Sequence, residues 1–167
     1  RLPTYADIEA VAVANGTAAL HLAVLALGIQ PCDEGITSPI TFVASANCIA
    51  YVGGIVVFAD VDPKTANIDP LEIRKKITTC TKVIIPVHYA GQSCDMEEIH
   101  RIAQEHGLYV IEDAAHAIGS IYKDTQVGSC HYSDMTTFSF HPVKTITTGE
   151  GGAITTNNKV LYEKLLL

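Results

Sequence analysis

A single lysine, Lys144, stands in the stretch TTFSFHPVKTITTGEGGA, which runs from Thr136 to Ala153. Most neighbouring residues are apolar or carry hydroxyl groups, and an amine taken out of bulk water is easier to deprotonate. A neutral lysine amine can attack a carbonyl carbon and form a Schiff base. Lys144 is therefore a candidate nucleophile. Single lysines beside loops are also commonplace on protein surfaces, so this stretch alone leaves both interpretations open.

A second candidate is Asp113, which follows Glu112 in the apolar stretch LYVIEDAAHAIGS. An aspartate at the end of a buried strand is costly unless a cation or hydrogen-bond donors meet it. Asp113 could cap a turn through the amide of Ala115 or His116. It could instead hold a pyridinium nitrogen protonated, which a pyridoxal phosphate enzyme needs if the ring is to act as an electron sink.

A third candidate is the tetrad Asn15-Gly16-Thr17-Ala18, which follows a short apolar stretch and opens the helical run AALHLAVLAL. A strand, a small polar turn and a helix N-terminus can bind phosphate, because free amides point outward and the helix dipole favours an anion. Asn15 or Thr17 could also simply cap the helix. The tetrad alone favours this simpler interpretation.

Alternating strands and helices must position these residues. Apolar runs predict the strands, and longer periodic runs predict the helices between them. The run IVVFADVD is nearly continuous and predicts a strand buried on both faces, whereas the residues from Thr136 to Phe140 alternate as a half-buried strand does. The expected strands are 9–14, 35–38, 55–62 and 136–140. Two more are expected: a buried strand that opens the stretch 82–91 and runs into a loop, and one that opens the stretch 108–120 and ends at its acidic pair. The expected helices are 17–28, 39–51, 70–76 and 95–107.

This alternation predicts an α/β fold with a mostly parallel sheet. Ligands of such sheets gather at the carboxyl ends of the strands. The turn at Gly16, the pair His88-Tyr89, Asp113 and Lys144 all follow predicted strands. They can therefore converge on one site although they lie far apart in the sequence.

The composition predicts one globular domain, because 48% of the 167 residues are apolar and 17% are charged. A net charge of −7 argues against a nucleic-acid or anionic-membrane partner. The most apolar run, 18–29, is too short to span a membrane. The 5 cysteines are scattered without a C-x-x-C pair, which predicts neither disulfides nor a zinc site and suggests a reducing cytoplasm. We expect no metal, and because the chain starts without methionine and ends in an unfinished helix, we expect a fragment of a longer protein.

Six segments of the sequence are distinctive, namely NGTAALHLA, SPITFVASAN, FADVDP, IPVHYAG, IEDAAHAIGS and FSFHPVKTITTGEGGAITTN. Together they resemble the DegT/DnrJ/StrS family of pyridoxal phosphate sugar aminotransferases. The resemblance implies the large domain of the fold type I transferases, a mostly parallel seven-stranded sheet between helices. Residues 1–167 would form part of that domain, and a C-terminal small domain would lie outside this chain.

The resemblance also implies roles at the matching positions. Lys144 would form the internal aldimine with pyridoxal 5'-phosphate and move the proton between cofactor and substrate. Asp113 would pair with the pyridine nitrogen. Phe42 would stack on the ring, and His116 would lie near the ring hydroxyl. The phosphate would be held by Gly16, Thr17, Ala18 and Ser139.

No role follows for His141 or Glu150, and His88 is more simply interpreted as a buried structural histidine. The sequence departs from the family pattern at Gly35, where a glycine inside a strand should weaken it modestly.

The implied reaction moves an amino group from glutamate to a nucleotide-linked 4-keto-6-deoxy sugar by a ping-pong scheme. The segments SPITFVASAN and FSFHPVKTITTGEGG are most similar to the branch that aminates UDP-4-keto-6-deoxy-N-acetyl-altrosamine. The whole enzyme would be a cytoplasmic homodimer whose partner subunit completes the site, so these residues alone should be inactive. Two alternatives stay open. One is a sugar dehydratase of the same family, which would carry histidine at Lys144, and the other is a noncatalytic binding relative, which needs no such lysine.

Overall fold

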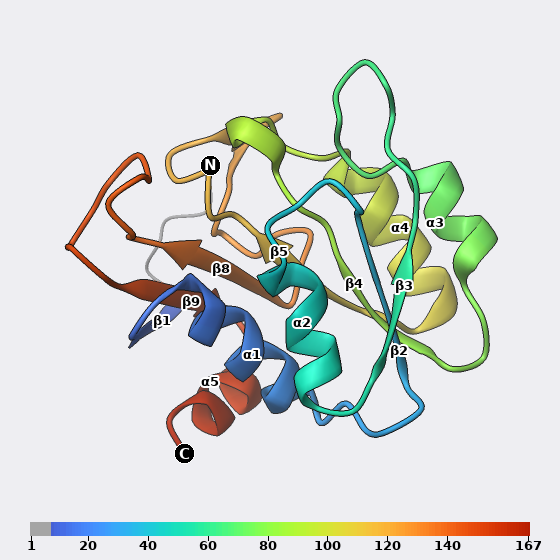
Figure 1. Ribbon diagram of the computed structural model, residues 1–167, viewed down its shortest axis with the longest axis horizontal. Helices are drawn as coiled ribbons and strands as arrows, with labels where there is room; N and C mark the ends of the chain where they lie inside the picture. Colours follow the sequence, from blue (N-terminus) through green and yellow to red (C-terminus); the bar gives the residue numbers. More distant parts are fainter. Residues whose placement is uncertain (1–7) are drawn as a thin grey trace.

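The computed structural model describes residues 8–167 and shows a seven-stranded sheet between layers of helices (Figure 1). Its strands are β1 (Glu9–Val13), β2 (Glu34–Thr37), β3 (Ile55–Phe58), β4 (Thr81–Ile85), β5 (Tyr109–Asp113), β8 (Met135–Ser139) and β9 (Gly152–Thr156). Their order across the sheet is β1-β9-β8-β5-β4-β2-β3. Strands β8, β5, β4, β2 and β3 are neighbours in that order and pair in parallel, and β9 runs antiparallel to both β8 and β1. The predicted mostly parallel α/β sheet is confirmed.

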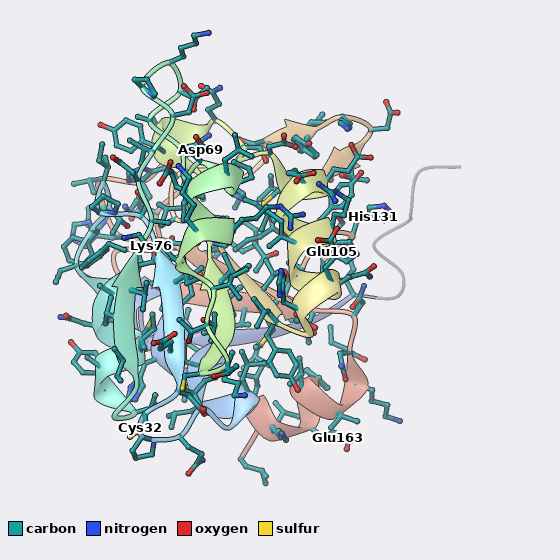
Figure 2. All side chains as sticks on the ribbon, turned by 90° about the vertical axis from the view of Figure 1, so that its right-hand side faces the viewer. Cys32, Asp69, Lys76, Glu105, His131 and Glu163 are labelled. Atoms are coloured by element: carbon teal, nitrogen blue, oxygen red, sulfur yellow. The ribbon has the colours of Figure 1, made fainter. Side chains whose placement is uncertain are left out.

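The helices are α1 (Gly16–Leu27), α2 (Ala44–Tyr51), α3 (Pro70–Lys76), α4 (Met96–His106) and α5 (Lys159–Leu165). Side chains of β4 alternate between the faces, so Val83 and Ile85 pack with α1, α2 and α5, whereas Ile84 packs with α3 and α4. Figure 2 shows α3 beside α4, where Arg74 and Glu105 form an ion pair at 2.8 Å. The smaller elements are a 3-10 helix, η2 (Tyr89–Gly91), and a hairpin of β6 (Ile121–Tyr122) and β7 (Thr125–Gln126).

Helix α1 has the ends that the sequence predicts. The Asn15 side chain accepts the amide of Ala18 at 2.8 Å, and Gly28 ends the helix in the left-handed conformation with φ 75°. Helices α3 and α4 also lie where they are predicted. None of the helices within residues 8–167 is long and apolar enough to cross a membrane.

The prediction that residues 55–62 form a strand buried on both faces is wrong. Strand β3 ends at Phe58 and lies at the edge of the sheet, where β2 is its one partner within the described part of the chain. Ile55 and Phe58 are therefore 49% and 48% exposed. An apolar run alone does not distinguish an edge strand from a central one.

The helix predicted over 39–51 begins five residues late, at Ala44. The hydroxyl of Ser38 accepts the amide of Ile40 at 3.0 Å, and such a local turn competes with helical hydrogen bonding. Residues 39–43 therefore form a loop after β2. This loop carries Phe42 towards the end of the sheet that is described next.

Strand β8 is not half-buried as its alternation suggested. Its residues from Met135 to Phe138 are all buried, because β8 lies between β5 and β9 with both faces covered. Gly35 has a packing role in β2: a Cβ added there would lie 2.5 Å from Cδ1 of Ile49 in α2. This glycine therefore lets α2 pack closely against the sheet.

Candidate functional site

A cavity of about 360 Å³ opens at the carboxyl ends of β5 and β8, beside the N-terminus of α1. The structure brings the turn before α1, Asp113 and Lys144 together here, as their positions after strands predict. His88 does not line this cavity. The predicted site residues that do line it are Gly16, Thr17, Phe42, Asp113, Ser139 and Lys144.

Two amides at the start of α1 are available to a ligand. The amides of Gly16 and Thr17 have no helical acceptor, because they begin the helix, and no acceptor within residues 8–167 contacts them. The amide of Ala18 is used by the side chain of Asn15. Capping and anion binding are therefore compatible at this turn, and Gly16 and Thr17 are the better placed donors.

Two glycines let the turn before α1 lie close to the sheet. A Cβ added at Gly16 would lie 2.7 Å from Cβ of Ser139, and one added at Gly152 would lie 2.6 Å from the carbonyl oxygen of Asn15. Side chains at these positions would fill the space beside the free amides. The hydroxyl of Ser139 thus stands next to the amides of the turn, which suits a phosphate group.

Asp113 is 5% exposed and its two carboxylate oxygens meet different donors. Oδ2 accepts the hydroxyl of Ser45 at 2.6 Å, and Oδ1 accepts the amide of Ala115 at 3.2 Å. The turn-capping interpretation is therefore confirmed for Ala115. A carboxylate has about four lone-pair sites, so Asp113 keeps the capacity to accept another hydrogen bond from the cavity.

Lys144 lies in the loop of residues 140–151 that joins β8 to β9. The carbonyl oxygen of Phe140 fixes the base of this loop by accepting the amide of Thr148 at 3.1 Å and the hydroxyl of Thr147 at 3.0 Å. Lys144 is half-buried, whereas the residues on either side of it are exposed. Its position at the cavity favours the functional interpretation over that of an ordinary surface lysine.

Two of the predicted residues lie beside the cavity rather than in its lining, namely Ala18 and His116. The pKa of His116 is lowered, first by burial and then by the charge of Lys144, while Asp113 opposes the shift. His116 is therefore close enough to both residues to sense their charges. Its imidazole is predominantly neutral at physiological pH.

His141 and Glu150 line the cavity although the sequence assigned them no role. They come from the two ends of the loop that carries Lys144, and their side chains approach to 3.8 Å between Nε2 and Oε1. Both side chains are largely exposed. They add one titratable base and one carboxylate to the cavity.

A buried polar cluster surrounds Glu112, the residue before Asp113. It was not predicted from the sequence. Oε2 of Glu112 accepts from Nε2 of His88 at 2.8 Å, and Oε1 accepts from the hydroxyls of Ser133 at 2.5 Å and Thr136 at 3.0 Å. Nδ1 of His88 accepts the amide of Cys94 at 3.2 Å. Burial alone would raise the pKa of Glu112, but the bonds from His88 and the two hydroxyls outweigh it and lower that pKa. The structural interpretation of His88 agrees with this geometry.

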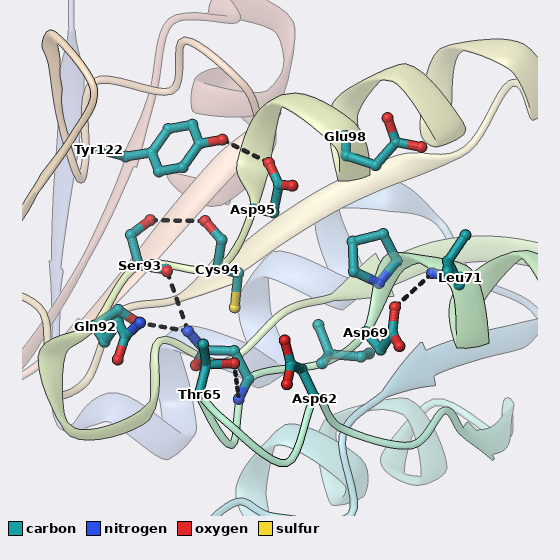
Figure 3. A pocket seen from close by; sticks show the side chains of 13 residues that line it. Asp62, Thr65, Asp69, Leu71, Gln92, Ser93, Cys94, Asp95, Glu98 and Tyr122 are labelled. Carbon is teal, nitrogen blue, oxygen red and sulfur yellow. Dashed lines mark hydrogen bonds between the residues drawn. The ribbon is translucent and has the colours of Figure 1, made fainter.

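A second, larger cavity of about 510 Å³ lies between the loops that follow β3 and β4 (Figure 3). Its carboxylates already stabilise the fold. Asp69 caps α3 by accepting the amide of Leu71 at 2.8 Å, and Asp95 accepts the hydroxyl of Tyr122 at 2.6 Å. No lysine is among the described residues that line this cavity, so the smaller cavity is the better candidate site. Residues 8–167 contain no group of three His, Cys, Asp or Glu residues placed to hold a metal.

The chain is similar to known proteins in both sequence and structure. Residues 4–167 match the model of a family described as the DegT/DnrJ/EryC1/StrS aminotransferase family. The spore coat polysaccharide biosynthesis protein SpsC of Bacillus subtilis is 51% identical over 94% of this chain and 40% of its own length. The GDP-perosamine synthase of Caulobacter vibrioides is 50% identical over 95% of this chain and 42% of its own length. The chain thus spans about two fifths of these curated relatives.

Solved structures of similar fold include an aminotransferase from Psychrobacter cryohalolentis, with a TM-score of 0.91 and 46% identity over 94% of this chain and 40% of that one. The NtdA protein of Bacillus subtilis, solved with bound cofactor PMP, has a TM-score of 0.87 and 39% identity over 93% and 35% of the two chains. Helicobacter pylori PseC, an aminotransferase of pseudaminic acid biosynthesis, has a TM-score of 0.88 and 38% identity over 95% and 43%. The architecture is that of the large domain of the fold type I transferases.

Proposed function

Because the chain belongs to the DegT/DnrJ/EryC1/StrS aminotransferase family, we propose that its cavity binds pyridoxal 5'-phosphate in a sugar aminotransferase. The observation that carries the proposal is the meeting of Lys144, Asp113 and the free amides of Gly16 and Thr17 around one cavity. Neither a dehydratase with histidine in place of the lysine nor a noncatalytic binding protein requires this set.

The residues fit the cofactor chemically. When bound, pyridoxal phosphate supplies an aldehyde carbon for amines and a ring that withdraws electrons. The amides of Gly16 and Thr17 and the hydroxyl of Ser139 would hold its phosphate. The carboxylate of Asp113 would hold a proton on the ring nitrogen, and Nζ of Lys144 would hold the cofactor and move a proton as a general acid and base.

Three further residues are assigned by family resemblance. Phe42, which is 71% exposed at the cavity, would stack on the ring. His116 would lie near the ring hydroxyl, which agrees with its position beside Lys144 and Asp113. The amide of Ala18 would join the phosphate site only if it left the side chain of Asn15.

The whole protein would take its amino group from glutamate and pass it to a nucleotide-linked 4-keto-6-deoxy sugar. Residues 1–167 would be part of its large domain, and the small domain would lie outside them, since the curated relatives are more than twice as long as the matched part. It would be a cytoplasmic homodimer. The exposure of Phe42 and of Val143, at 71% and 78%, suits a partner subunit that covers the cavity.

The test uses the full-length parent protein with pyridoxal phosphate. Borohydride reduction followed by peptide mass spectrometry should find a pyridoxyl group on Lys144, and Lys144→Ala should lose this label and all transamination. Lys159→Ala changes an exposed lysine of α5 and serves as the matched control. Label on another lysine, or undiminished transamination by Lys144→Ala, would refute the assignment.

The acceptor is tested separately. We propose UDP-4-keto-6-deoxy-N-acetyl-altrosamine, supported by the branch resemblance and by the similarity to PseC. A GDP-linked sugar is the second candidate, because the chain is 50% identical to a GDP-perosamine synthase. Glutamate-dependent amination should be measured with both sugars in parallel. A clear preference for the GDP-linked sugar would overturn the first assignment and leave the aminotransferase activity intact.

A further inference from the structure

A serine that the sequence analysis did not single out lies directly behind the carboxylate of Asp113. Ser45 is fully buried in the first turn of α2, and its Oγ lies 2.6 Å from Oδ2 of Asp113. The same Oγ lies 2.7 Å from the hydroxyl of Thr41. One side chain therefore joins α2, the loop before it and the end of β5.

The direction of these hydrogen bonds follows from what each group can donate. An ionised carboxylate only accepts, so Ser45 gives its single hydroxyl hydrogen to Asp113. The contact between Ser45 and Thr41 then requires the hydroxyl of Thr41 to be the donor. This arrangement is a directed chain from Thr41 through Ser45 to Asp113. Bonds to ionised groups are stronger than neutral ones, and bonds in a chain polarise one another.

The hydrogen bonds from Thr41 through Ser45 fix the orientation of the Asp113 carboxylate at the cavity. Ser45 binds Oδ2, while the amide of Ala115 binds Oδ1. Donors on both oxygens restrict rotation of the carboxylate plane. The amide of Ser45 also donates to the carbonyl of Phe42 at 3.2 Å. The turn that carries Phe42 at the rim of the cavity is thus tied to the carboxylate inside it.

We propose that Ser45 is a positioning residue for Asp113, with Thr41 as the donor behind it. This role rests on the proposed function, because it places the Asp113 carboxylate against the ring nitrogen of the cofactor. Ser45 would touch neither cofactor nor substrate. It would act through Asp113, and its effect should vanish when the charge of Asp113 is removed.

The experiment measures the dissociation constant of pyridoxamine 5'-phosphate, which binds without a covalent bond, to the full-length protein by calorimetry. Ser45→Ala should weaken binding about tenfold, because a hydrogen bond to a charged group is lost. Thr41→Val should weaken it less, and Thr41→Ser should restore it. Thr37→Val, which removes an equally buried hydroxyl bonded to the carbonyl of Ile85 at 2.9 Å, is the matched control and should leave binding unchanged.

A double-mutant cycle separates positioning from a general loss of structure. In an Asp113→Asn background, Ser45→Ala should change the dissociation constant by less than about twofold. An equal effect in both backgrounds, or no effect of Ser45→Ala and Thr41→Val on binding, would overturn the role of Ser45. A wild-type protein that does not bind pyridoxamine phosphate would instead overturn the proposed function itself. Melting temperatures measured without cofactor identify any variant that fails to fold, and Thr41→Val then carries the test.

Discussion

Glu112 and Asp113 are consecutive carboxylates at the end of β5, and both are buried, yet their surroundings differ. Glu112 faces a closed cluster in which His88, Ser133 and Thr136 all donate to it. Asp113 faces the cavity, and its donors among residues 8–167 are two, Ser45 and Ala115. Alternation along the strand sends the two side chains to opposite faces of the sheet.

The contrast shows how neighbouring residues of one type can serve different ends. The closed cluster gives Glu112 three donors and connects β5 to the segment that follows β4 through His88, whose amide also donates to the carbonyl of Asp113 at 3.1 Å. Glu112 therefore stabilises the strand ends. Asp113 is held in place with spare capacity to accept, which suits a group that must meet a ligand. Substitutions at the two positions should separate stability from function.

The largest effect is expected at Asp113. Asp113→Asn should lower kcat/KM of the full-length enzyme roughly 100- to 1000-fold, because the charge that holds the ring nitrogen protonated is lost. The free energy of unfolding should fall by only about 1 kcal/mol, since the amide can keep one of the two hydrogen bonds. Steady-state kinetics and urea unfolding measure the two quantities. Asp124→Asn, at an exposed position, is the control, and equal activity of the two variants would contradict the assignment.

At Glu112 a substitution should affect stability more than cofactor binding. Glu112→Ala leaves His88 and two hydroxyls without their buried acceptor, which should lower the free energy of unfolding by about 3–5 kcal/mol. Cofactor binding per folded molecule should stay within about twofold of the wild type, because Asp113 is unchanged. Glu163→Ala, on the exposed side of α5, controls for the loss of a carboxylate. If the unfolding midpoint of Glu163→Ala fell as far as that of Glu112→Ala, the loss of the buried cluster would not explain the loss of stability.

The pH dependence of stability should expose the same cluster. The pKa of Glu112 in the folded chain lies below its ordinary value of 4.5, so its stabilising effect is present above pH 4.5 and is lost as the pH falls through the folded value. The difference in unfolding free energy between the wild type and Glu112→Gln should therefore be largest near neutral pH and shrink on acidification. A difference that grew below pH 4.5 would show that Glu112 is not held ionised.

The smallest effect concerns two thiols, one near each carboxylate. Burial, followed by the charge of Asp113, raises the pKa of Cys48 to about 12, and burial is the main cause that raises the pKa of Cys130 to about 11. Neither should react with iodoacetamide at pH 8, whereas the exposed Cys32 and Cys80 should. Glu112→Ala should speed labelling of Cys130 by favouring local opening. Mass spectrometry follows each site, and equally slow labelling of Cys130 in that variant would contradict the stabilising role of the cluster.

Much of the fold and of the site could be predicted from the sequence. Asp113 ends β5 and Lys144 follows β8, and the rule that ligands gather at strand ends suffices to bring them together. Helix α1 could be located because Gly28 marks its end and either Asn15 or Thr17 could cap its start; the structure shows Asn15 as the cap. These are local signals that need no knowledge of packing.

The features that were missed depend on neighbours distant in the sequence. An apolar run does not reveal that β3 lies at the edge of the sheet formed by the described residues. The glycine-rich segment at Gly152 gave no strand signal, and β9 forms because β1 and β8 flank it. Ser45 looks like any helical serine, and no motif in the sequence singles it out. The partner that matters, Asp113, becomes apparent only in three dimensions.

The position of β9 also has a consequence for how the protein folds during its synthesis on the ribosome. The turn at Asn15-Gly16 emerges early but rests against Gly152, at the start of a strand made near the end of these residues. Until β9 has emerged, β1 lacks its antiparallel partner. The turn that carries the amides of Gly16 and Thr17 then also lacks the backbone against which it packs. Pairings so distant in sequence form slowly, because a long loop must close first. Synthesis that stalls before residue 152 would therefore leave a chain whose parallel strands can assemble while its anion-binding corner stays unformed.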